Sequence, residues 1–203
     1  MKLKSLFRET DPALVYNRDP TVKKKRVFNS KIWDVRNLVD RPVDLSDSLP
    51  PLYTASTGRD STLIFESRFE SGNLSRAVKL GPKEYNLLLA NDTNSRGNTQ
   101  WFFFRVTNTF KRSAVRFHLI NLRKKDSLFN HGMRVLVYSK KHFKETGEGW
   151  YRDGSDIAYY ANGIPRGNRN NTKYYSLSFT HTFEYSADTV YFAYSVPYTY
   201  TQL

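Results

Sequence analysis

Hydrophobic and polar side chains alternate with a period of two along most of the chain after residue 60. In the clearest run, residues 174–184, one face carries Tyr175, Leu177, Phe179 and Phe183, and the other carries Ser176, Ser178, Thr180, Thr182 and Glu184. Successive side chains of a β-strand point to opposite faces, so this alternation predicts a strand with one buried face. Residues 115–119 alternate in the same way.

Further strand-like segments follow one another along the chain, at residues 63–69, 85–89, 101–106, 134–138 and 189–194. The segment 101–106 (Trp-Phe-Phe-Phe-Arg-Val) is apolar on both faces at its start, which is typical of a central strand covered on both sides. One short helix is expected over residues 140–147. Tight turns are expected at residues 94–97, at Asp153 with Gly154 and at Asn162 with Gly163. Because no helices alternate with the strands, the pattern predicts an all-β fold: an antiparallel, jelly-roll-like β-sandwich.

Residues 1–60 have a different character from the rest of the chain. Prolines at positions 12, 20, 42, 50 and 51 interrupt short apolar pieces, and no period persists. We expect an extended, partly ordered arm over residues 1–60 and the β-sandwich over residues 61–203. The Lys-Lys-Lys-Arg run from Lys23 to Arg26 is either a nuclear-import signal or a solvated run within the arm.

Composition places the chain in a reducing compartment and favours acidic partners. Cysteine is absent, which excludes disulfides and thiolate metal sites. No apolar run approaches the roughly 20 residues that cross a bilayer, and the first residues lack a signal-peptide pattern. We therefore expect a soluble cytoplasmic protein without a membrane partner, with a nuclear location open as well. The net charge is +13, and residues 61–203 hold 20 basic and 11 acidic residues, a surplus that attracts polyanions.

The histidines do not predict a catalytic or metal site. His142 and Glu145 have the His-x-x-Glu spacing of many zinc sites, but four nearby cations oppose Zn²⁺ there, and a catalytic zinc needs three protein ligands. We interpret this pair as part of a solvated helix turn. His181 shares a face with Phe179 and Phe183, so we expect it to be buried and hydrogen-bonded. None of the histidines, His118 and His131 included, has a Ser or Asp partner at a recognisable triad spacing, and no catalytic residue is assigned.

Residues 63–74 (Leu-Ile-Phe-Glu-Ser-Arg-Phe-Glu-Ser-Gly-Asn-Leu) resemble the opening signature of the N-terminal domain of cytosolic carboxypeptidases. The resemblance continues in order through residues 85–89, 99–106, 132–134, 138–139, 149–150, 157–160, 191–194 and 197–201. It covers residues 63–203 and leaves residues 1–60 outside.

The resemblance implies a β-sandwich placed directly before a zinc peptidase domain that would begin after residue 203. Enzymes of this family remove C-terminal amino acids, chiefly glutamates, from substrates that include polyglutamylated tubulin tails. Their zinc is held in the peptidase domain, where it polarises the scissile carbonyl and activates a water. The resemblance therefore predicts a segment without catalytic residues or cofactor of its own, in a parent zinc metallocarboxypeptidase.

Two groups of residues are candidates for binding. Cations in two predicted loops would form a positive collar if the loops share one rim of the sandwich: Arg123, Lys124, Lys125, Arg166 and Arg169. They would either steer polyglutamate towards the peptidase domain or serve as solubilising charges. Tyr198 and Tyr200 follow Pro197 in an aromatic tail, which suits a connector packed against the peptidase domain.

Two other functional classes stay open. A basic β-sandwich with exposed Tyr and Phe side chains could bind nucleic acid, although no RNA-binding consensus is present. A sandwich could also bind carbohydrate through aromatic platforms, but the missing cysteines and signal peptide oppose that extracellular role. The expected partners are accordingly the peptidase domain of the parent chain and acidic polyglutamylated tails.

Overall fold

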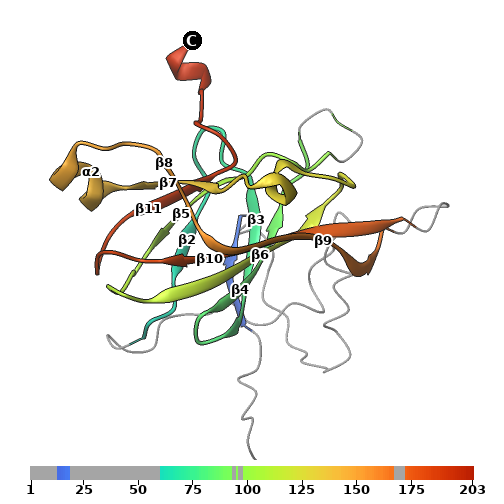
Figure 1. Ribbon diagram of the computed structural model, residues 1–203, viewed down its shortest axis with the longest axis horizontal. Helices are drawn as coiled ribbons and strands as arrows, with labels where there is room; N and C mark the ends of the chain where they lie inside the picture. Colours follow the sequence, from blue (N-terminus) through green and yellow to red (C-terminus); the bar gives the residue numbers. More distant parts are fainter. Residues whose placement is uncertain (1–12, 19–59, 93–94, 96–97, 167–171) are drawn as a thin grey trace, which may run out of the picture.

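The computed structural model describes residues 13–18, 60–92, 95, 98–166 and 172–203, which form two packed β-sheets (Figure 1). One sheet has six strands in the order β1 (Ala13–Asn17), β3 (Leu74–Gly81), β4 (Glu84–Leu89), β6 (Ala114–Leu122), β10 (Lys173–Thr182) and β9 (Ser155–Pro165). The other has five, in the order β2 (Ile64–Glu66), β5 (Phe103–Thr107), β11 (Val190–Ala193), β7 (Val135–Ser139) and β8 (Tyr151–Asp153). The helical pieces are η1 (Leu128–His131), α2 (Lys140–Thr146) and η2 (Tyr200–Gln202).

The predicted all-β sandwich is confirmed, with one departure from antiparallel pairing. Strands β4 and β6 run parallel, with Glu84 beside Arg116 and Leu87 beside Leu119. A parallel pair cannot be joined by a tight hairpin, so the chain leaves this sheet after β4 and builds β5 in the other sheet before it returns as β6.

The core between the sheets is mainly aromatic. The rings of Phe117 and Phe179 from the six-stranded sheet meet those of Phe104 and Phe192 from the five-stranded sheet, and none of the four is exposed. The Phe117 ring lies 5.3 Å from both the Phe179 and the Phe192 ring, measured between centroids. Burying each ring contributes about 2–3 kcal/mol. The alternation of apolar residues in the sequence therefore marks the faces that form this core.

The opposite face of β10 differs from the prediction, because two of its serines are buried as well. Tyr160 and His118 project from the neighbouring strands, and their polar atoms lie 3.2 Å and 2.6 Å from the Ser178 hydroxyl. Ser176 receives a hydrogen bond from the Asn162 side chain. Side chains that reach across the sheet thus shield β10 from solvent on the face that its sequence marks as polar.

Strand β1 lies within the segment expected to be an arm, and the sequence pattern did not predict it. It pairs with β3, from Ala13 opposite Lys79 to Asn17 opposite Arg76. The Tyr16 ring is buried in the core, and its hydroxyl accepts a hydrogen bond from the Ser67 amide at 3.1 Å. This burial raises the pKa of Tyr16. The proposed boundary at residue 60 stays a prediction.

Two of the predicted tight turns do not form hairpins. Gly154, with φ at 112°, joins β8 in the five-stranded sheet to β9 in the six-stranded sheet, so the chain changes sheet there. Asn162 and Gly163 lie inside β9, where the Asn162 side chain donates to the Ile120 carbonyl at 2.8 Å. The third predicted turn falls mostly outside the described residues.

The predicted helix is confirmed as α2. The Ser139 hydroxyl caps its first turn by accepting the His142 amide, and Gly147 ends it with φ at 78°. A serine before the first turn and a glycine in the left-handed conformation after the last are the usual helix boundaries.

Candidate functional site

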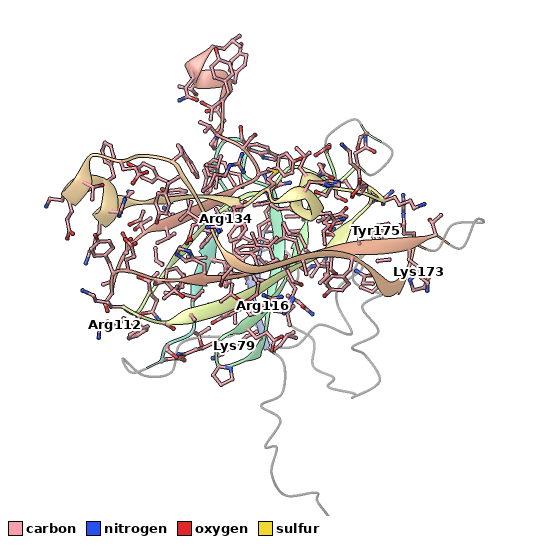
Figure 2. All side chains as sticks on the ribbon, viewed as in Figure 1. Lys79, Arg112, Arg116, Arg134, Lys173 and Tyr175 are labelled. Atoms are coloured by element: carbon pink, nitrogen blue, oxygen red, sulfur yellow. The ribbon has the colours of Figure 1, made fainter. Side chains whose placement is uncertain are left out.

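Two predicted collar residues meet on a single tyrosine. Arg123 follows β6, and Arg166 follows β9, where its amide donates to the Thr172 carbonyl. The guanidinium carbons of Arg123 and Arg166 lie 5.7 Å and 5.8 Å from the centre of the Tyr174 ring, at the start of β10. Tyr174 is fully buried. Two loops more than 40 positions apart in the sequence therefore share one rim of the sandwich, at the end that Lys173 and Tyr175 mark in Figure 2.

The aromatic ring fixes both guanidinium groups. The face of a phenol ring is electron-rich and attracts a cation, which is worth about 1 kcal/mol per contact. Both arginines were predicted from the sequence as binding residues, but no sequence pattern predicted that both would contact the Tyr174 ring.

Of the remaining collar residues, Lys124 and Lys125 belong to the described part of the chain, and Arg169 does not. Lys124 and Lys125 are exposed, and the Lys124 carbonyl accepts a hydrogen bond from the Tyr159 hydroxyl at 2.6 Å, which anchors their loop to β9. Arg169 lies outside the described residues. Asp126 adds one negative charge to the same loop, and hydrogen bonds from Asn130, the Ser127 amide and His131 lower its pKa.

The C-terminal tyrosines are exposed. Tyr198 and Tyr200 expose 69% and 86% of their surface, on a segment that projects from the sandwich (Figure 1). Its last turn, η2, is tied down by Glu70, whose carboxylate accepts the Thr201 amide at 2.9 Å and the Thr201 hydroxyl at 2.8 Å. These bonds lower the pKa of Glu70.

His142 and Glu145 are not brought together around a common point. The His142 ring contacts Glu184 and Glu148, at 3.0 Å and 3.1 Å, and these bonds raise its pKa. Glu145 instead accepts the Tyr185 hydroxyl at 2.8 Å. Within the described ranges, no three His, Asp or Glu side chains gather as metal ligands. The family resemblance places zinc in the peptidase domain, and no catalytic step is assigned to the described residues.

His181 is buried and hydrogen-bonded, as predicted. Its Nδ1 lies 2.7 Å from a carboxylate oxygen of Asp153, and this bond is the main cause that lowers the pKa of Asp153. Asp153 belongs to β8 and His181 to β10, so the pair bridges the two sheets.

His118 has a serine and a glutamate partner that the spacing in the sequence did not reveal. It lies between Ser178, at 2.6 Å, and Glu84, at 2.9 Å. Parallel pairing of β4 with β6 and antiparallel pairing of β10 with β6 bring these residues side by side. The Ser178 side chain is buried, so this Ser-His-Glu group offers no accessible nucleophile and is a structural network.

No helix within the described ranges is long and apolar enough to span a membrane.

Comparison with known proteins assigns the chain to a family. Residues 65–195 match the family model of the cytosolic carboxypeptidase N-terminal domain. The chain is 46% identical to human cytosolic carboxypeptidase 2 over 144 residues, which cover 71% of this chain and 16% of that protein. It is 38% identical to bovine cytosolic carboxypeptidase 3 over 193 residues, which cover 95% of this chain and 18% of that protein.

Solved structures with a similar arrangement are metallocarboxypeptidases. One from Pseudomonas aeruginosa, in complex with (2-guanidinoethylmercapto)succinic acid, has a TM-score of 0.46 and 23% identity over 68% of this chain and 31% of that chain. The chain spans less than a fifth of the length of the two curated relatives described above, at 16% and 18%. Because the family model matches well over half of its residues, the chain belongs to the cytosolic carboxypeptidase family, as the N-terminal domain.

Proposed function

We propose that this chain is the non-catalytic N-terminal domain of a zinc metallocarboxypeptidase that removes C-terminal glutamates from acidic proteins such as polyglutamylated tubulin. In this proposal the domain supports the peptidase domain and helps acidic tails to reach it. The observation that carries the steering role is the convergence of Arg123 and Arg166 on Tyr174.

The collar has the properties that recognition of a glutamate tail requires. Its two arginines are held in place before a ligand arrives, so less side-chain entropy is lost on binding. Lys124 and Lys125 are exposed beside them and extend the positive charge into solvent. Attraction between such charges and a polyglutamate tail acts over about 8 Å at physiological ionic strength and weakens as salt is added.

The peptidase part of the parent would supply the metal chemistry, in which a bound Zn²⁺ polarises the scissile carbonyl and activates a water. This chain would supply charge on one rim and a contact through Tyr198 and Tyr200. Both tyrosines are largely exposed, as expected for side chains that a following domain covers. The relatives are named cytosolic, which supports a cytoplasmic location for this chain. The lysine-rich run from Lys23 to Arg26 lies outside the described residues.

Charge reversal in the parent chain tests the steering role. We expect the double variant Arg123→Glu with Lys124→Glu to weaken binding of a glutamylated peptide about tenfold and to flatten its salt dependence. The measurement is fluorescence anisotropy across a salt series. A peptide of the same length without the added glutamates and a single-stranded oligonucleotide serve as reference ligands.

A matched variant controls for net charge. Lys111→Glu with Arg112→Glu changes the total charge equally at two exposed positions, and Figure 2 shows Arg112 at the opposite end of the molecule from Lys173. It should leave peptide affinity within about twofold. Equal losses from both double variants, or no loss from either, would refute a local collar, and tighter binding of the oligonucleotide than of the peptide would favour the nucleic-acid function.

A further inference from the structure

The outer face of the five-stranded sheet carries a continuous layer of aromatic rings. We define this aromatic face as Phe69, Trp101, Phe103, Tyr138, Phe143, Trp150 and Tyr191. Phe103, Tyr138 and Tyr191 come from β5, β7 and β11, and the others from adjoining loops and α2. Side chains at the alternate positions of these strands, such as Phe104, Val137 and Phe192, point into the core. The aromatic face is therefore the side of the sheet that faces away from the core.

Ring contacts join the whole set. Phe103 lies at its centre, 4.9 Å from Phe69, 5.9 Å from Trp150 and 6.0 Å from Tyr191 between ring centroids. Tyr138 extends the layer, 5.6 Å from Trp150 and 5.7 Å from Phe143. The rings thus form one contiguous surface.

These rings cover one another only in part. Phe103 is nearly buried at 8% exposure, Phe143 is 47% exposed, and the other five lie between buried and exposed. Contiguous apolar patches on a protein surface mark interaction sites, and aromatic residues are enriched in such interfaces. A layer of seven neighbouring rings has the composition of an interface core.

The course of the chain suggests what covers this surface. Glu70, next to Phe69, holds Thr201 in the last turn of the chain through two hydrogen bonds. The Trp101 indole nitrogen donates to the Ser71 carbonyl at 2.7 Å in the same loop. The C-terminal segment is therefore held at the edge of the aromatic face. The chain covers only 16% of a relative such as human cytosolic carboxypeptidase 2, so most of such a protein lies outside the matched part.

We propose that the aromatic face is the docking surface for the peptidase part of the parent chain. This inference rests on the proposed function for the identity of the occupant. The contact is mainly apolar, so it should persist at salt concentrations that abolish binding of acidic peptides to the collar.

Cysteine labelling tests the proposal, because the chain has no cysteine of its own. Phe143→Cys and Tyr138→Cys place thiols on the aromatic face, and Tyr160→Cys places one on the outer face of the six-stranded sheet. Phe143 and Tyr160 are matched, at 47% and 46% exposure. Labelling rates are measured by peptide mass spectrometry in the 203-residue chain and in the parent, so each position is its own reference.

We expect labelling at positions 138 and 143 to be at least about tenfold slower in the parent than in the 203-residue chain, with position 160 unchanged. Position 138 lies nearer the centre of the face and decides the result if the two differ. Unchanged labelling at position 138 in the parent would overturn the proposal. Protection already present in the 203-residue chain would overturn it as well. That protection would indicate a second copy if it disappears on dilution. It would indicate residues 19–59 if it disappears when only those residues are deleted and β1 is kept.

This experiment is independent of substrate. A parent chain that protects position 138 but removes no glutamate would count against the proposed function alone. A parent that removes glutamate without protecting position 138 would count against the docking surface alone.

Discussion

The outer faces of the two sheets differ in chemistry although both sheets share one aromatic core. On the six-stranded sheet, Arg116 donates to Thr180 and to the Asp156 carbonyl, and His118 lies between Ser178 and Glu84. On the five-stranded sheet, the corresponding surface is the aromatic face. A polar network satisfies its own hydrogen bonds and can remain in water, whereas a layer of rings gains free energy when another surface covers it. The comparison indicates which side of the sandwich faces solvent and which side is suited to a partner.

The largest loss of stability is expected from a substitution in the core that both sheets share. Phe117→Ala removes a ring that contacts both Phe179 and Phe192 and should lower the free energy of unfolding by about 3–5 kcal/mol. Urea denaturation followed by circular dichroism measures this. Tyr160→Ala, on the solvent face, should cost less than about 1 kcal/mol, and similar losses from the two variants would show that the ring positions are not distinguished as core and surface.

An intermediate loss of stability is expected from removing the hydrogen bond between Asp153 and His181, which bridges the sheets. Asp153→Asn weakens the bond to buried His181 and should lower the free energy of unfolding by about 1 kcal/mol at neutral pH. The pKa of Asp153 is lowered in the folded state, so its contribution is fully present above the unfolded carboxyl pKa, near 4. It should disappear as the pH falls from about 4 through the lower folded pKa.

Parallel urea titrations of both proteins from neutral pH to about pH 3 measure this difference. The curves of the free energy of unfolding against pH should converge at the acid end. A gap that stays constant through the acid range would mean that the carboxylate charge of Asp153 does not stabilise the sheet contact.

The smallest change in stability is expected from a substitution at the edge of the aromatic face. Glu70→Ala removes both acceptors of Thr201 and should release η2 without a measurable change in global unfolding, because Glu70 and Thr201 are exposed. Hydrogen exchange of the Thr201 amide should become faster. Slow exchange retained in the variant would show that another contact holds the C-terminal turn.

The sequence predicted the strands whose side chains alternate, because burial on one face imposes a period of two. Strands 115–119 and 174–184 were found in this way, and they correspond to β6 and β10. The pattern at residues 155–165 failed because Asn162 with Gly163 has the composition of a turn. In β9 the Asn162 side chain bonds the neighbouring strand instead, and sequence spacing does not reveal such a cross-strand partner.

The binding surfaces were only partly visible in the sequence. Arg123 and Arg166 stood out as loop cations, but their common contact with Tyr174 depends on the order of β6, β10 and β9 in the sheet. The apolar residues on both faces of segment 101–106 predicted a central strand covered on both sides, and β5 lies between β2 and β11, but they did not predict the aromatic face. The extent of the aromatic face could not be predicted from the sequence, because Phe69, Phe143 and Trp150 belong to loops and a helix that lie far apart in the chain.

The central claim is that this chain works as one domain of a larger peptidase. The most direct test is the mass of the endogenous protein, by immunoblot of cell extract with an antibody against residues 61–203. We expect a band larger than 23.7 kDa by a whole peptidase domain, and glutamate removal by the immunoprecipitated protein. A band near 23.7 kDa alone would contradict it and would mean that the basic sandwich acts without a peptidase domain.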